Sequence, residues 1–230
     1  EQTAAIVTGV ANACKAVGCA LIGGELAELP GLYKPGEYDL VGFAVGVVER
    51  SRIIDGSAVS EGDVVLGLAS SGLHSNGYSL ARKALLEVGG LSLSDTAEGL
   101  DCTLGEELLK PTRLYSPSIV AALDAGLRPK AIVHITGGGL PGNVIRCVPE
   151  RFRAVINIES FPRPPVFGLI QRLANVPDAE MYRTFNMGIG MVLVCSREEA
   201  GALRANLEAS GEAVYEIGRI EAGKREVRLV

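Results

Sequence analysis

The chain has only two histidines, and both occupy similar positions in the sequence. His74 lies in SSGLHSNGYSL, residues 70–80, and His134 lies in KAIVHITGGGLPGN, residues 130–143. His74 comes just after an apolar run that predicts a strand, His134 stands at the end of another, and glycines that predict a tight turn come soon after each. His134 sits inside its apolar run, which is typical of a core histidine. His74 is predicted to be presented to a ligand by a polar loop, together with Ser70, Ser71, Ser75 and Asn76.

Three consecutive glycines after the second histidine predict an anion site. Thr136 and Gly137–Gly139 lie between a predicted strand and a predicted helix, where unhindered backbone N–H groups can converge on a phosphate. A tight turn that requires positive φ would explain the same glycines without any ligand. Both interpretations of Gly137, Gly138 and Gly139 stay open at this point.

The same segment also fits the dinucleotide motif G-x-G-x-x-G, at Gly137, Gly139 and Gly142. Glu159 follows at about the distance expected of a ribose-binding acid. Pro149 comes too soon after these glycines to leave room for the usual long crossover helix. A dinucleotide-dependent oxidoreductase is therefore kept only as a distant alternative, which predicts NADH binding.

Glu25 follows two glycines at the end of a predicted strand, CALIGGE. A carboxylate in this position can meet a Mg²⁺ ion that carries phosphates, and Glu28 is either a second ligand or a solvated loop acid. The chain contains no G-x-x-x-x-G-K-[ST] segment, which argues against a P-loop.

The elements that would position these groups mix helices and strands without strict alternation, which predicts an α+β fold. Thr3 is expected to cap a helix that ends at Gly18, followed by strands in CALIGGE and in residues 39–48. The polar stretch 51–63 predicts a boundary between a domain at 1–52 and one at 57–230. In the second domain, strands are expected in DVVLGLA, KAIVHI, AVINIE and MGIGMVLVC, with helices after SNG, after TGGG and from Ser196 to Leu207. The last two strands, in EAVYEIGRI and REVRLV, are expected to pair across the EAGK turn.

Composition narrows the class of protein further. Lys and Arg number 22 against 27 Asp and Glu, giving a net charge of −5, and no basic run suggests nucleic-acid binding. The apolar run 40–48 is far shorter than the roughly 20 residues that span a bilayer. Five scattered cysteines fit reduced thiols, so we expect a cytoplasmic protein without membrane or nucleic-acid partners. The start EQTAA has neither an initiator Met nor a signal peptide, which suggests a processed or truncated product.

Five motifs, taken in order, resemble the aminoimidazole ribonucleotide synthetase family, also called phosphoribosylformylglycinamidine cyclo-ligase. They are GGELAELPGLYKPGEYDLVGFAVGVVE, SSGLHSNGYSL, PTRLY, HITGGGLPGN and FNMGIGMVLV. The family usually has Thr where this chain has Leu26. The resemblance implies two α+β domains that meet at a cleft, a homodimer formed through the N-terminal domain, and a further N-terminal segment that carries ATP and metal groups.

The family's reaction is an ATP-dependent ring closure in purine biosynthesis. ATP phosphorylates the formamide oxygen of formylglycinamidine ribonucleotide, the amidine nitrogen attacks the activated carbon, and phosphate leaves. The resemblance implies His74 and Asn76 as catalytic residues and Glu25 as a Mg²⁺ ligand. It implies substrate or phosphate contacts by the three serines, Thr136 with Gly137–Gly139, and Asn186.

The alternatives within this superfamily are formylglycinamidine synthetase, selenophosphate synthetase and thiamine-monophosphate kinase. HSNGYSL and HITGGGL favour the cyclo-ligase over these. A non-catalytic dimerisation module is an alternative of another class, and the intact His74, Asn76 and Asn186 argue against it. Without the further N-terminal segment, we expect this chain to be inactive by itself.

Overall fold

The computed structural model describes residues 2–34 and 36–230 of the 230-residue chain. Glu1, where the expected first domain starts, and Pro35, in the motif that begins GGELAELPGLYKPGEY, lie outside this description. The chain divides into two units, Glu1–Ile53 and Ile54–Val230. This division falls next to the expected boundary between residues 52 and 57.

The first unit contains one long helix, α1 (Gln2–Ala16), and a short 3₁₀ helix, η1 (Arg50–Arg52). The expected end of the helix is confirmed: Gly18 has φ of +68°, and the Cys19 N–H donates to the Cys14 carbonyl at 2.9 Å. The expected cap is wrong, because α1 already includes Gln2 and Thr3 therefore lies inside the helix.

Neither strand expected in the first unit forms among its described residues. CALIGGE and residues 39–48 have no regular secondary structure, and Val41, Phe43 and Val47 are 93% to 99% exposed. A segment with the apolar pattern of a strand forms one only when a neighbouring segment pairs with its backbone N–H and C=O groups. The described part of this unit offers one isolated bridge, Pro30 to Tyr33, and no buried residue.

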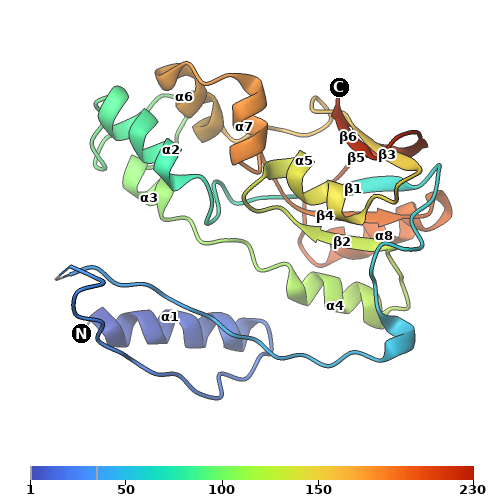
Figure 1. Ribbon diagram of the computed structural model, residues 1–230, viewed down its shortest axis with the longest axis horizontal. Coiled ribbons are helices and arrows are strands. Elements are labelled where there is room, and N and C mark those ends of the chain that lie inside the picture. The colour runs from blue at the N-terminus through green and yellow to red at the C-terminus, as the bar shows by residue number, and fades with distance from the viewer. Residues whose placement is uncertain (1, 35) are drawn as a thin grey trace. The chain divides into compact units, whose positions relative to one another are not determined.

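The second unit is built around a six-stranded sheet (Figure 1). In chain order its elements are β1 (Val64–Ala69), α2 (Tyr78–Arg82), the π-helical η2 (Lys83–Val88), α3 (Leu104–Leu108), α4 (Ser116–Asp124), β2 (Ala131–His134), α5 (Gly139–Val144), the 3₁₀ helix η3 (Ile145–Cys147), β3 (Phe152–Ile156), α6 (Pro165–Ala174), α7 (Asp178–Thr184), β4 (Ile189–Cys195), α8 (Arg197–Ala209), β5 (Val214–Ala222) and β6 (Glu226–Leu229).

The strand order is β2-β4-β1-β5-β3-β6, and every neighbouring pair is antiparallel except β3 and β6. The predicted α+β class is therefore confirmed. The sheet does not have the topology of a dinucleotide-binding fold. Such a fold would place β2 and β3 side by side and parallel, whereas here three strands separate them. The expected hairpin of β5 and β6 is also wrong: β3 lies between them, and Arg153 on β3 forms ion pairs with Glu221 on β5 and Glu226 on β6.

Helices cover both faces of the sheet, and alternate residues of each strand point to opposite faces. On β1, Val65 faces a large core shared with α2, α5, α6 and α7, and Val64, Leu66 and Leu68 face a smaller core under α4 and α8. Ser196 caps α8 as expected, accepting the Glu199 N–H at 3.3 Å. The wider π-helical turn of η2 leaves Val88, its last residue, 56% exposed. Among residues 2–34 and 36–230, no helix combines the length and the apolar character needed to cross a bilayer.

Candidate functional site

The strand order explains why motifs far apart in the sequence meet. β1 and β2 flank β4 and are both antiparallel to it, so they run parallel to each other and end at the same edge of the sheet. One intervening strand separates their ends, a spacing of about 10 Å. The serine loop (residues 70–77) follows β1, the glycine loop (residues 136–139) follows β2, and the segment 185–188 leads into β4. The three loops therefore converge.

His74 is the centre of the serine loop, but it points inward. Its side chain is 4% exposed, and its Nε2 accepts the Ser71 N–H at 3.1 Å and faces the Arg113 N–H at 3.5 Å. A ring that accepts at Nε2 carries its proton on Nδ1, which is buried without a partner within the described structure. Burial, followed by the nearby His134 and Arg113, lowers the pKa of His74 to about 4. We expected the loop to expose this ring to a ligand; that expectation is wrong, because the ring is buried.

The other serine-loop residues mostly bond within the protein. The Ser70 hydroxyl donates to Asn186 Oδ1 at 2.9 Å, and the Ser71 hydroxyl donates to the Pro111 carbonyl at 2.6 Å. Ser75 shares a 3.0 Å hydrogen bond with Thr112, and both of these hydroxyl groups lie at the surface. Of the four polar residues predicted around His74, Ser75 and Asn76 therefore remain the best placed to meet a ligand.

The glycine loop adopts the positive φ that the turn interpretation requires, with +100° at Gly138 and +59° at Gly139. The Gly137 N–H donates to Asn76 Oδ1 at 3.0 Å, and the Gly139 N–H donates to the Thr136 carbonyl at 3.0 Å. The expectation of three free N–H donors is therefore wrong, because two of them are already bonded. The Asn76 contact joins the two loops, and its amide oxygen occupies the place on Gly137 that a ligand oxygen would take.

The two histidines lie next to each other, a proximity that sequence reasoning did not predict. The ring centroids of His74 and His134 are 6.5 Å apart, and Tyr115 lies 6.1 Å from the first and 6.4 Å from the second. The Tyr115 hydroxyl donates to the Ala69 carbonyl at 2.7 Å, and burial raises the pKa of this phenol. A Cβ at Gly190 would collide with both Tyr115 and His74, so only glycine fits on β4 under this cluster.

A half-buried ion pair supports the segment that carries Tyr115. Arg113 Nε donates to Glu212 at 2.6 Å, and the Ser118 hydroxyl donates to the same carboxylate at 2.6 Å. Glu212 is 6% exposed. The pair ties the PTRLY motif to the turn after α8, and with it the Arg113 backbone N–H that faces His74.

A pocket of about 380 Å³ opens beside β2. Because β2 is an edge strand, the backbone groups on its outer side lack a strand partner. In the described part of the chain, Arg146 in the pocket wall has no ion-pair partner, whereas hydrogen bonds from Ser57 lower the pKa of Asp55. These features suit a small polar ligand with an anionic group near Arg146. The lining residues are Ile54, Asp55, Gly56, Ala131, Ile132, Val133, His134, Thr136, Arg146 and Cys147.

Glu25 lies in the first unit, exposed and outside any helix or strand. No group of three or more His, Cys, Asp or Glu side chains among residues 2–34 and 36–230 is arranged to hold a metal ion. Glu25 therefore fits a Mg²⁺ ion only as one ligand among others, since Mg²⁺ that carries phosphates needs few protein carboxylates.

Comparison with known proteins follows the same division of the chain. The model of the AIR synthase related protein C-terminal domain matches residues 60–230, and that of the N-terminal domain matches residues 1–48. The phosphoribosylformylglycinamidine cyclo-ligase of Myxococcus xanthus is 51% identical over the whole chain, and that of Anaeromyxobacter sp. (strain Fw109-5) is 56% identical over 98% of it. The chain spans 66% and 65% of the lengths of these two relatives.

A solved structure shares the fold at low sequence identity. The hydrogenase maturation protein HypE aligns with 76% of this chain and 51% of its own, with a TM-score of 0.50 and 13% identity. The family models and the relatives agree with each other over nearly every residue. The chain belongs to the AIR synthase related family.

Proposed function

We propose that this chain is part of a phosphoribosylformylglycinamidine cyclo-ligase, an enzyme that uses ATP to close an imidazole ring in purine biosynthesis. The observation that carries the proposal is the 51% identity to a protein of that name over all 230 residues. The substrate is formylglycinamidine ribonucleotide, and the products are aminoimidazole ribonucleotide, ADP and phosphate. The full-length protein acts in the cytoplasm as a homodimer.

In the proposed reaction, the γ-phosphoryl group of ATP is transferred to the formamide oxygen. The amidine nitrogen attacks the formamide carbon, a C–N bond forms, and the C–O bond to the new phosphate breaks. Such chemistry depends on positioning and on donors aimed at the phosphoryl oxygens. The loops that converge beyond β4 supply backbone N–H groups and the amide of Asn76 for this purpose.

The proposed roles of individual residues follow their environments. Ser75, Asn76 and the glycine loop contact the substrate, with the adjoining pocket beside β2 holding a polar part of it. When the substrate binds, one of its oxygens replaces Asn76 Oδ1 as the acceptor of the Gly137 N–H. His74 is neutral above pH 5 and buried, which supports a role in orienting the serine loop and disfavours direct proton transfer. Glu25 gives one carboxylate oxygen to a Mg²⁺ ion held mainly by the ATP phosphates.

The test is turnover by the full-length protein that contains this chain. We expect ADP and aminoimidazole ribonucleotide to form in equal amounts, and only when both ATP and formylglycinamidine ribonucleotide are present. The isolated chain should form neither product. ADP formation that depends on selenide or on thiamine monophosphate would overturn the proposal in favour of another superfamily member.

A Gly137→Ala variant tests the part assigned to the glycine loop. An added Cβ would meet only Asn76 Oδ1, at 3.6 Å, and φ at this position is not positive, so the variant should fold normally. A methyl group beside the N–H should raise the KM for the ribonucleotide at least tenfold. A Gly142→Ala variant, where a Cβ meets nothing within 4 Å, is the matched control. An unchanged KM in Gly137→Ala would remove the glycine loop from the substrate site.

A further inference from the structure

Two asparagines are buried behind the converging loops. Asn143 on α5 is 0% exposed, and Asn186, just before β4, is 4% exposed. A buried amide is costly unless all of its donors and acceptors are bonded. Both amides are bonded to the loops at almost every site they offer, one amide to each loop.

Asn143 collects the carbonyl groups of the glycine loop. Its Nδ2 lies within hydrogen-bond distance of the carbonyl oxygens of Thr136 (3.2 Å), Gly137 (3.3 Å) and Gly139 (2.8 Å). Its Oδ1 accepts the Thr136 hydroxyl at 3.2 Å. The buried NH₂ group thus places its two N–H donors among three converging carbonyl oxygens.

The direction of these bonds fixes the direction of the N–H groups. In a trans peptide unit the C=O and the N–H point opposite ways. By holding the Thr136 and Gly137 carbonyls inward, Asn143 turns the N–H groups of Gly137 and Gly138 away from the core. The Gly137 N–H meets Asn76 Oδ1 on that outer side.

Asn186 binds two carbonyl groups of the serine loop. Its Nδ2 donates to the carbonyls of Gly72 (2.8 Å) and Leu73 (3.2 Å), and its Oδ1 accepts the Ser70 hydroxyl and the Gly188 N–H. It also lies beside Met187, a buried residue with φ of +53°, while the loop it holds contains His74 with φ of +59°. Bulky residues persist in this backbone region only where their surroundings hold them there.

We propose that Asn143 and Asn186 are positioning residues, one for each loop, that aim the backbone N–H groups of the glycine loop and the serine loop at anionic oxygens of the substrate. The proposal rests on the proposed function for the identity of that substrate. The kind of group that binds does not depend on that identity: it is a phosphate or phosphoryl group, which accepts hydrogen bonds from backbone N–H donors.

The first measurement uses the chain as it is, with inorganic phosphate as the probe. Asn143→Asp keeps the shape and the Oδ1 acceptor but replaces the NH₂ donor with an oxygen that the three carbonyls repel. We expect its phosphate Kd to rise at least tenfold, and amide hydrogen exchange in residues 136–140 to accelerate. Asn186→Asp should accelerate exchange in residues 70–76.

A control separates positioning from stability. Leu203 on α8 is 1% exposed and belongs to the smaller core on the other face of the sheet. Leu203→Ala should lower the melting temperature without changing the phosphate Kd or the exchange of either loop. If Asn143→Asp fails to fold, Asn143→Ser, which keeps one donor, replaces it with an expected smaller rise in Kd.

Steady-state kinetics of the full-length protein supply the second measurement. We expect Asn143→Asp to raise the KM for the ribonucleotide, and Leu203→Ala to leave KM unchanged. Phosphate affinity equal to the wild type in both asparagine variants, or an equal loss in Leu203→Ala, would overturn the positioning role. If the wild-type full-length protein binds phosphate but shows no cyclo-ligase turnover, and Asn143→Asp still weakens phosphate binding, the proposed function fails and the positioning role stands. A wild type that binds no phosphate would overturn the positioning role.

Discussion

The buried, neutral state of His74 predicts a specific dependence of stability on pH. The folded protein holds this ring at a pKa of about 4, while an unfolded chain has the ordinary value of 6.5. Below pH 6.5 the unfolded state therefore binds a proton that the folded state does not, and stability falls. The loss begins as the pH drops through 6.5 and is complete near pH 4.

The magnitude follows from the two pKa values. At about 1.4 kcal/mol per pKa unit, the difference corresponds to a loss of about 3 kcal/mol, which residual solvent screening reduces to about 2 kcal/mol. Such a loss is a large part of the free energy of unfolding of an ordinary domain, about 5–15 kcal/mol. It should therefore be plain in urea unfolding between pH 7.5 and pH 4.5.

The assay compares the wild type with His74→Asn, followed by circular dichroism because the chain has no Trp. Asn tolerates positive φ better than most residues, so the variant keeps the loop conformation while losing the titration. His134→Gln is the control, since His134 is exposed and only partial burial lowers its pKa. With two histidines in the chain, these variants also assign both imidazole Hε1 signals in NMR titrations. Parallel stability curves for the wild type and His74→Asn, or a His74 signal that titrates near pH 6.5, would refute the reasoning.

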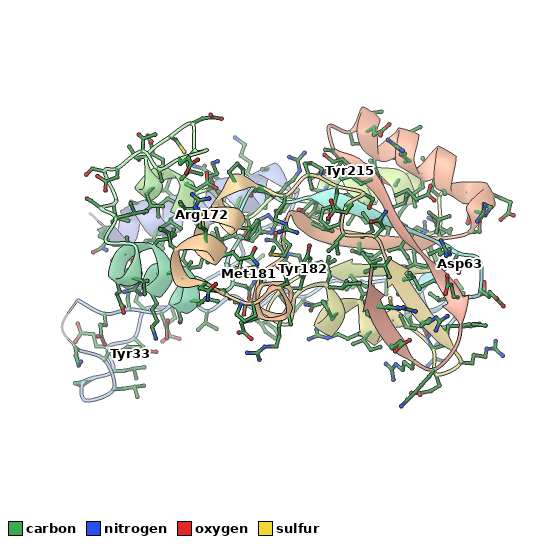
Figure 2. All side chains as sticks on the ribbon, turned by 90° about the horizontal axis from the view of Figure 1, so that it is seen from above. Tyr33, Asp63, Arg172, Met181, Tyr182 and Tyr215 are labelled. Atoms are coloured by element: carbon green, nitrogen blue, oxygen red, sulfur yellow. The ribbon has the colours of Figure 1, made fainter. Side chains whose placement is uncertain are left out.

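Two further substitutions test the packing around the site. Gly139→Ala would place a Cβ against the Tyr182 carbonyl at a position with φ of +59°, so we expect thermal unfolding to show a fall of more than about 1 kcal/mol in stability. Gly142→Ala, the control, should be neutral or slightly stabilising. Equal melting temperatures would contradict the close approach of α7, the helix on which Figure 2 shows Tyr182 beside Met181. Glu212→Gln removes the charge partner of Arg113, which is 38% exposed, so we expect the free energy of unfolding to fall by about 1–2 kcal/mol. High salt should lower the stability of the wild type, whose ion pair it screens, and leave that of the variant unchanged. A fall below about 0.5 kcal/mol would show that this pair does not hold the PTRLY segment.

Local sequence patterns predicted the elements of the second unit well, because its helices and strands carry their own signals. Ser196 with Glu199 marks the start of α8, and the apolar run 189–195 becomes β4, buried at every residue. The same approach failed where pairing was non-local. EAVYEIGRI and REVRLV look like a hairpin, yet β3 separates them, and no local pattern in either strand encodes that insertion.

The sequence identified the residues of the candidate site but did not predict how they contact one another. The glycines and serines were identified, but which N–H groups remain free depends on Asn76 and Asn143, whose contacts join residues 61 and 6 positions away from Gly137. Asn143 lies within the quoted HITGGGLPGN motif, so the signal was present. Its role was invisible because an asparagine in a glycine-rich stretch is equally typical of a turn.

The likeness in setting between the two histidines has a structural cause that only the strand order reveals. His74 follows β1 and His134 is the last residue of β2, and these two strands run parallel on either side of β4. Two loops with the same local pattern of polar residues and glycines are therefore brought to one edge of the sheet. Gly190 on the strand between them leaves the space that Tyr115 and His74 fill. Repeated local patterns indicate equivalent positions in the fold, but the two histidines can approach each other only because the strand between them has no side chain at residue 190. A side chain at residue 190 would therefore collide with His74 in the serine loop and with Tyr115, and would push these two rings away from the strand that separates the two loops.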